Sequence, residues 1–108
     1  ERVLERLCGV PTPAVGAGRT DAGVHAHGQG VGVRVAARWS PEALQRAMNA
    51  LLPEDIWIAS AHAMVPAFHP RRSATARRYG YLVGTDAAAR SPFRRPFEWH
   101  VRQPLDPD

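Results

Sequence analysis

Proline and glycine residues divide this chain into short segments, which limits the helices and strands that it can form. The sequence holds 10 prolines and 9 glycines among 108 residues. Proline lacks a backbone N–H donor and glycine supplies left-handed conformations, so both residues mark turns and the ends of elements. Pro53 ends the clearest helical pattern, and prolines interrupt the connection over residues 65–75. The chain is therefore expected to alternate short helices and strands with loops.

Two segments carry the signals of helices. Residues 3–8 place apolar side chains at helical spacing, and Gly9 follows where a helix commonly ends. Ser40 and Pro41 are a helix N-cap and a first-turn proline. An apolar stripe follows them, formed by Leu44, Ala47, Met48 and Leu51. These patterns predict one helix at the start of the chain and a second one that Pro53 stops.

Three segments carry the signals of strands, because their apolar, β-branched or aromatic residues alternate with others. They are residues 27–35, a run beginning at Ile56, and residues 76–83. Residues 11–18 are expected to form a loop, and a polar tail is expected from Ser91 onwards. Short strands interleaved with helices predict an α/β (α+β) fold of the split βαβ type.

The charge balance indicates a possible partner. All 14 basic residues are arginine, and 10 acidic residues leave a formal net charge of +4. Guanidinium groups pair well with phosphate and stack on exposed bases, which favours a polyanionic partner. A coding bias towards arginine and alanine explains the same composition. Charge alone leaves these two interpretations open.

Length, cysteine content and hydropathy limit the classes of protein to which this chain can belong. A chain of 108 residues suffices for one domain or part of one. Cys8 is the single cysteine, so no intrachain disulfide can form and a reducing, cytoplasmic location is expected. No apolar run approaches the roughly 20 residues of a membrane span, so no membrane association is expected.

The segment from Gly16 to Gln29, GAGRTDAGVHAHGQ, is the first candidate for chemistry. Arg19 and Asp21 project to the same side of an extended backbone, so the guanidinium can keep the carboxylate ionised. An ionised, oriented carboxylate can act as a nucleophile at a sugar carbon or as a general base. Two alternatives stay open: a glycine turn in which Asp21 caps backbone amides, and a weaker one, a phosphate-binding loop.

His25 and His27 alternate on a strand-like stretch and, with Asp21 or His62, suggest a metal site as a further alternative. Zinc sites need three or four converging ligands, and no H-x-x-x-H or H-E-x-x-H spacing is present. Histidines that form hydrogen bonds or contact RNA are the preferred interpretation, and no metal is expected.

The segment from Phe68 to Tyr81, FHPRRSATARRYGY, is the second candidate. It interleaves four arginines with aromatic residues, a mixture suited to phosphate contacts and to stacking on an unpaired base. The alternative is that Tyr79 and Tyr81 belong to the core and the arginines to a solvated face.

Together the two segments resemble the bacterial tRNA pseudouridine synthase A family. The resemblance is carried by GRTDAGVHA followed by GQ, by F-x-x-R-x-x-A, and by R-R-Y-x-Y, in this order. It implies a pseudouridine synthase fold, a mainly antiparallel sheet flanked by helices, of which this chain would hold an incomplete ferredoxin-like half. It also implies that residues 1–108 are part of a catalytic domain that lacks its N-terminal strand and C-terminal half.

The resemblance implies isomerisation of uridine to pseudouridine in the anticodon stem-loop of tRNA, without a cofactor, by a homodimer. The implied catalytic residues are Asp21, as nucleophile or base, Arg19 beside it, and Tyr79. Candidate substrate contacts are Tyr79, Arg71, Arg77, Arg78, His25 and Gln29. Departures at His27, Pro70, Arg72 and Gly80 leave the RNA contacts around them open. The alternatives are a non-catalytic RNA-binding module, an inactive fragment of such an enzyme, and a metal hydrolase.

Overall fold

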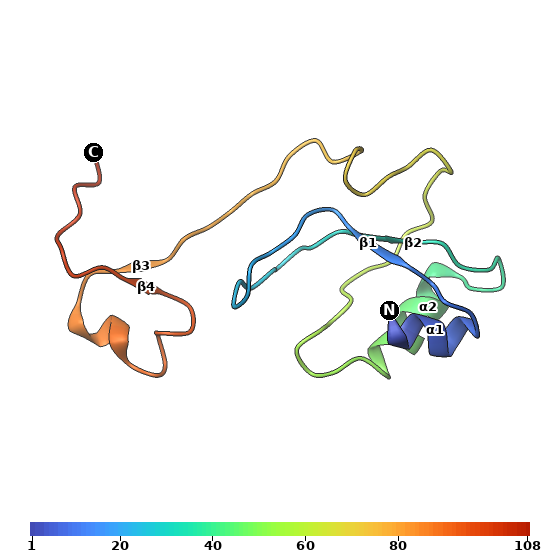
Figure 1. The fold of residues 1–108 in the computed structure, drawn as a ribbon, viewed down its shortest axis with the longest axis horizontal. Helices are drawn as coiled ribbons and strands as arrows, with labels where there is room; N and C mark the ends of the chain where they lie inside the picture. Colours follow the sequence, from blue (N-terminus) through green and yellow to red (C-terminus); the bar gives the residue numbers. More distant parts are fainter. The chain divides into compact units, whose positions relative to one another are not determined.

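A computed structural model describes residues 1–108, which form two compact units. Unit 1 comprises Glu1–Thr20 and His25–Thr75, and unit 2 comprises Asp21–Val24 and Ala76–Asp108. The elements of unit 1, drawn in Figure 1, are α1 (Arg2–Cys8), β1 (Ala14–Gly16), β2 (Val31–Val33) and α2 (Pro41–Asn49). Those of unit 2 are β3 (Val83–Gly84), the 3-10 helix η1 (Ala87–Arg90) and β4 (Trp99–His100).

The two predicted helices are confirmed. Gly9 ends α1 in the left-handed conformation, with φ of 74°, and its N–H donates to the carbonyl of Glu5 at 2.8 Å. The Ser40 hydroxyl caps α2 by accepting from the amide of Ala43 at 3.2 Å. The second helix ends at Asn49, before Pro53, so the last residue of the expected stripe lies outside it.

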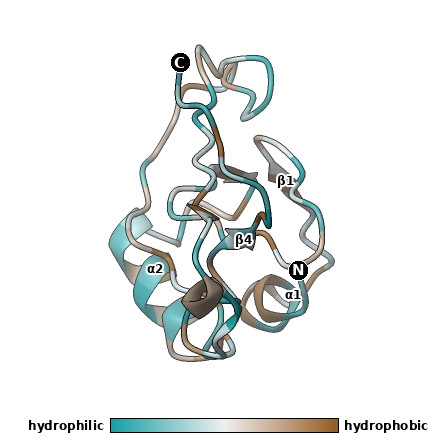
Figure 2. Ribbon diagram, turned by 90° about the vertical axis from the view of Figure 1, so that its left-hand side faces the viewer, coloured by the Kyte–Doolittle hydropathy of each residue, from teal (hydrophilic) through white to brown (hydrophobic).

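The core of unit 1 lies between α1 and α2. Leu4 of α1 is 1% exposed and Leu44 of α2 is 8% exposed, and the two helices pack against each other. Both are amphipathic, with hydrophobic and hydrophilic stretches that alternate along the ribbons in Figure 2. Burial of one apolar stripe from each helix is therefore what holds this part of unit 1 together.

Strands β1 and β2 form an antiparallel pair in which Ala14 lies opposite Val33 and Gly16 opposite Val31. The predicted loop at residues 11–18 therefore contains a strand, and the predicted strand at 27–35 is limited to three residues. The physical reason is that a strand extends only as far as a partner satisfies its backbone, and β1 offers a partner over three residues.

The strand predicted from Ile56 onwards is absent, because side chains of α2 take the place of a partner strand. The amide of Ile58 donates to the Asn49 side-chain oxygen at 2.9 Å, and the Ile58 carbonyl accepts from the Asn49 side-chain nitrogen at 2.9 Å. Gln45 donates to the carbonyls of Ile58 at 3.1 Å and Ala59 at 2.9 Å. The segment at Ile58 and Ala59, called the strip below, is therefore bound to α2 by side-chain hydrogen bonds.

The strand predicted over residues 76–83 is reduced to β3, which pairs in parallel with β4. The ladder is continued by the Trp99 amide, which donates to Leu82 at 2.7 Å, and by the Val101 amide, which donates to Gly84 at 3.0 Å. The sequence analysis assigned the residues of β4 and η1 to no element. Parallel pairing needs a crossover, which residues 85–98 provide.

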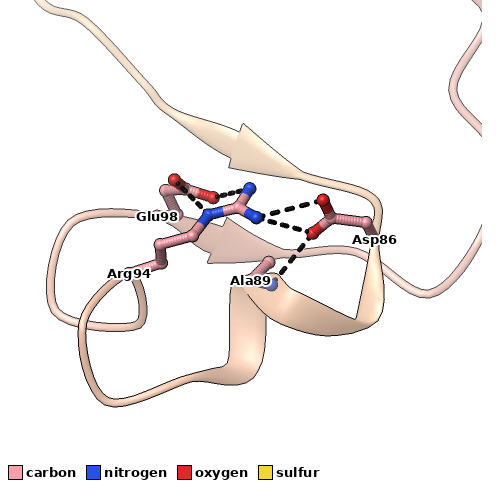
Figure 3. A network of polar contacts seen from close by, with 4 residues as sticks. All are labelled: Asp86, Ala89, Arg94 and Glu98. Atoms are coloured by element: carbon pink, nitrogen blue, oxygen red, sulfur yellow. Dashed lines mark hydrogen bonds and ion pairs between the residues drawn. The ribbon is translucent and has the colours of Figure 1, made fainter.

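The crossover of unit 2 is held by one arginine, shown in Figure 3. Arg94 donates to both carboxylate oxygens of Asp86 at 3.0 Å and to those of Glu98 at 2.9 and 2.7 Å. Asp86 also caps η1 by accepting from the amide of Ala89 at 2.9 Å, and Ala89 is fully buried. The first part of the expected polar tail, residues 91–98, therefore forms turns that lead into β4, whereas residues 101–108 form no helix or strand.

The chain thus has a small α+β arrangement of two helices and two separate two-stranded sheets, one antiparallel and one parallel. The predicted class is confirmed at this level. The described residues do not form the expected mainly antiparallel sheet. β1 pairs with β2 and β3 pairs with β4, so the strands form two sheets of two strands each. None of the helices has the length and apolar character needed to span a bilayer.

Substitution of Asn49 by alanine is expected to free the strip at Ile58. The change removes both hydrogen bonds to Ile58. The Ile58 carbonyl still accepts from Gln45, but the Ile58 amide is left unpaired, which costs about 1–3 kcal/mol. Hydrogen exchange at the Ile58 amide measures this loss. The matched control is Arg46→Ala, at an exposed position of the same helix. Equal protection of Ile58 in the two variants would contradict this account of the strip.

Acid is expected to loosen the crossover of unit 2. Hydrogen bonds from Arg94 hold the pKa of Asp86 and of Glu98 below their ordinary values of 3.8 and 4.5. The stabilisation is therefore complete above the ordinary values and is lost as the pH falls through the lowered ones. The protection factor of the Trp99 amide should fall over this acidic range. An Arg94→Met variant should lack the transition, and an unchanged transition would show that other groups cause it.

Candidate functional site

The segment GAGRTDAGVHAHGQ begins at the end of β1 and continues almost to β2, and its two arms are joined by hydrogen bonds. The Ala17 amide donates to the Gly30 carbonyl at 2.7 Å, which continues the pairing beyond β1. The Gln29 side chain then donates to the Gly18 carbonyl at 2.6 Å. Gln29, predicted as a substrate contact, thus has a structural role. Its side-chain amide forms a hydrogen bond across the two arms where a backbone amide would form one in a strand pair.

Asp21 opens a tight turn in the middle of this connection. The Val24 amide donates to the Asp21 carbonyl at 3.2 Å, and Gly23 has a φ of 83°. A positive φ at the third position is typical of a type II turn and favours glycine there. This explains why the sequence has glycine two residues after the aspartate.

The carboxylate of Asp21 is exposed and accepts no hydrogen bond in the structure. The turn uses the backbone carbonyl of Asp21, and no amide is capped by its side chain. The alternative in which Asp21 serves only as a cap is therefore wrong. A carboxylate without an internal partner is available to act on a ligand.

Arg19 lies two residues before Asp21 and is also exposed. The ion pairs of the structure both belong to Arg94, one with Asp86 and one with Glu98. The pairing of Arg19 with Asp21 therefore stays a prediction.

A turn at His69–Ser73 brings Arg71 to the start of this loop. The Arg71 Nε donates to the carbonyl of Gly16, the last residue of β1, at 3.3 Å. The His69 Nδ1 accepts from the backbone amides of Arg71 at 3.2 Å and Arg72 at 3.3 Å. Arg71 was predicted to contact RNA, and the structure shows that one of its donors is used within the protein.

The structural role of His69 was not predicted from the sequence. Its side chain accepts from the amides that follow, its carbonyl accepts from the Ser73 amide at 2.8 Å, and its own amide donates to the Ser73 hydroxyl at 3.0 Å. This pattern resembles a helix capping box, because the side chain of each end residue, His69 and Ser73, accepts from a backbone amide of the same turn. The signal that could have found it is a polar acceptor followed at the fourth position by serine.

The histidines of the loop, His25 and His27, are exposed. His25 takes part in an interaction within the structure, so its expected contact with the substrate stays a prediction. The structure brings no three histidine, cysteine, aspartate or glutamate side chains together in a way that could hold a metal ion. The metal hydrolase alternative thus gains no support from the arrangement of Asp21, His25 and His27.

The segment that carries Tyr79 belongs to unit 2, as does the Asp21–Val24 turn. Tyr79 is 65% exposed and Tyr81 is 81% exposed, so the alternative that both tyrosines are core residues is wrong. Their rings are open to stacking partners, and the neighbouring arginines 77 and 78 are also exposed. No hydrogen bond joins Tyr79 to Asp21, and their joint action stays a prediction.

Comparison with known proteins identifies relatives along the whole chain. The chain is 41% identical over 108 residues to the tRNA pseudouridine synthase A of Pelobacter propionicus, which covers 100% of the chain and 44% of that protein. It is 42% identical over 103 residues to that of Moorella thermoacetica, covering 95% of the chain and 42% of the relative. It is 42% identical over 107 residues to that of a Geobacillus species, covering 98% of the chain and 43% of the relative.

The chain therefore spans less than half the length of these curated relatives. No protein-family model matches it, and no solved structure does.

Proposed function

We infer that this chain, a homologue of tRNA pseudouridine synthase A along its whole length, carries the catalytic loop of an enzyme that converts uridine to pseudouridine in tRNA. The observation that carries this proposal is the Asp21 turn. The Asp21 carbonyl accepts the turn hydrogen bond from Val24, while the carboxylate is exposed and without a partner. A carboxylate presented in this way can reach a substrate that enters from solvent.

In the proposed reaction the bond between N1 of uracil and C1′ of ribose breaks, the uracil rotates, and C5 bonds to C1′. The proton on C5 leaves to a base and N1 gains a proton, so atoms balance without a metal or organic cofactor. Asp21 either attacks C1′ or removes a proton from the sugar beside it. Both routes need an ionised carboxylate close to the sugar.

The uridine must leave its stack to reach Asp21, and this extrusion costs a few kcal/mol. Arg19 is proposed to hold the carboxylate ionised and to keep the extruded nucleotide in place. The exposed ring of Tyr79 is proposed to stack on the uracil or to assist proton transfer at C5. Arg71, Arg77 and Arg78 offer guanidinium groups for phosphate contacts.

For the whole protein we propose the pseudouridine synthase fold, with its mainly antiparallel sheet, and a homodimer that binds the anticodon stem-loop of tRNA in the cytoplasm. Residues 1–108 are proposed to be part of its catalytic domain. The relatives, named tRNA pseudouridine synthase A and similar along the whole chain, support tRNA as the substrate and pseudouridine formation as the reaction. The mixed pattern of two small sheets is compatible with a segment of such a domain.

Substitution of Asp21 by alanine should abolish isomerisation, because no other carboxylate lies in the 16–29 segment. Release of tritium from tRNA labelled at C5 of uridine measures the reaction, with the full-length protein that carries this chain. The rate should fall at least about a thousandfold, as expected when a nucleophile is removed.

The matched control for this variant is Asp55→Ala, another exposed aspartate whose side chain forms no hydrogen bond in the structure. It should keep the wild-type rate. If Asp21→Ala also keeps it, the assignment of Asp21 is wrong. If the wild type binds tRNA in a salt-dependent way but releases no tritium, the protein is an RNA-binding module without this activity.

A further inference from the structure

We propose that the His69–Ser73 turn is a clamp that positions the catalytic loop, and that His69 and Arg71 are positioning residues. The inference rests on the proposed function, because it assigns these residues to the loop that carries Asp21. It starts from the contacts that this turn makes with both strands of unit 1, one contact on β1 and one on β2.

The turn is stabilised by His69, which accepts hydrogen bonds from two of its backbone donors. The neutral imidazole accepts through Nδ1 from the amides of Arg71 and Arg72, at 3.2 and 3.3 Å. Two further hydrogen bonds, at 2.8 and 3.0 Å, join His69 and Ser73 through backbone and hydroxyl groups. Four hydrogen bonds within five residues therefore stabilise this conformation of the turn.

The contact with β2 is made by Pro70. The proline ring lies so close to Gly32 that a Cβ on this glycine would be 2.9 Å from the ring Cγ. Any larger residue at position 32 would therefore push the turn away from the strand. Gly32 has no left-handed conformation, so this close approach is the reason for glycine in the middle of β2.

The contact with β1 is made by Arg71. Its Nε donates to the Gly16 carbonyl at 3.3 Å, a bond strengthened by the charge of the guanidinium. Gly16 is the last residue of β1 and is followed at once by the Ala17–Gly30 and Gly18–Gln29 hydrogen bonds. The terminal nitrogens of Arg71 form no hydrogen bond in the structure and stay open to a phosphate.

The clamp matters because the β1–β2 pair is only three residues long. An isolated two-stranded pair is marginally stable in water. The geometry at the base of the loop that leads to Asp21 therefore depends on added contacts, and the His69–Ser73 turn contacts both strands there. A displacement of about 1 Å at a reacting group can lower a rate by about a hundredfold.

The first test compares His69→Ala with His69→Asn in the full-length protein, using tritium release from labelled tRNA. Alanine removes the acceptor, whereas asparagine is a good capping residue and restores it. We expect His69→Ala to lower kcat between about tenfold and a hundredfold with KM for tRNA nearly unchanged, and His69→Asn to recover most of the loss. His62→Ala, an exposed histidine of the same unit, should behave as wild type.

The second test does not depend on activity. Hydrogen exchange at the Ala17 amide measures the stability of the Ala17–Gly30 hydrogen bond, the first one beyond β1. Exchange at the Leu44 amide measures the stability of α2, elsewhere in unit 1. We expect faster exchange at Ala17 and unchanged exchange at Leu44 in His69→Ala. Gly32→Ala should have the same effect through displacement of Pro70, and it keeps the test decisive if His69→Ala does not fold.

The outcomes separate this proposal from the proposed function. A raised KM with unchanged kcat in His69→Ala, or unchanged exchange at Ala17 in both variants, would overturn the clamp. Absence of isomerase activity in the wild type would overturn the proposed function, while faster exchange at Ala17 would still support the clamp as an element of the fold.

Discussion

The antiparallel pairing of β1 with β2 determines where the residues between them can lie. With Gly16 opposite Val31, the connection carrying Arg19 and Asp21 must leave and re-enter the pair side by side. The pair is short, so its geometry depends on added contacts: the Gln29 side chain along the arms and the His69–Ser73 turn at the base. In the Asp21 turn the backbone carbonyl accepts a hydrogen bond, whereas the carboxylate is exposed and accepts none.

Side chains complete the backbone hydrogen bonding in both units. In unit 1, Asn49 replaces a partner strand for Ile58, and the His69 side chain accepts from two amides of the turn that follows it, as a helix N-cap does. In unit 2, Asp86 caps η1 while Arg94 holds it to Glu98. A segment with few long strands has few backbone partners to offer, so polar side chains are what satisfy its amides and carbonyls. The architecture therefore depends on particular residues more than on regular sheet.

Local signals predicted the helices, because a helix is stabilised by neighbours in sequence. The Ser40 cap and the Gly9 terminator act within four residues, and both are confirmed. Strands were predicted less well, because a strand needs a partner that no local pattern specifies. The segment at Ile58 has strand-like alternation but is paired with the side chain of Asn49, and β4 has no such alternation and is paired.

The candidate site divides in the same way. The residue types around Asp21 predicted an ionised, oriented carboxylate on an extended backbone, with a glycine turn as the alternative. The structure has the turn, with Gly23 at positive φ, and the Asp21 carboxylate is exposed rather than used as a cap. The internal roles of Gln29 and Arg71 could not be predicted, because they depend on which carbonyls the fold brings near. His69 was missed because its role depends on the conformation of the residues that follow it.

The central claim is that Asp21 acts on the sugar of a uridine in tRNA. The most direct measurement is a structure of the full-length protein bound to tRNA, in which the distance from the Asp21 carboxylate to the ribose of an extruded uridine is read. The account predicts an extruded uridine whose ribose lies within about 3.5 Å of this carboxylate, a distance from which reaction can proceed. A bound tRNA whose uridines all remain stacked, or an extruded uridine held by other residues with Asp21 facing solvent, would contradict it.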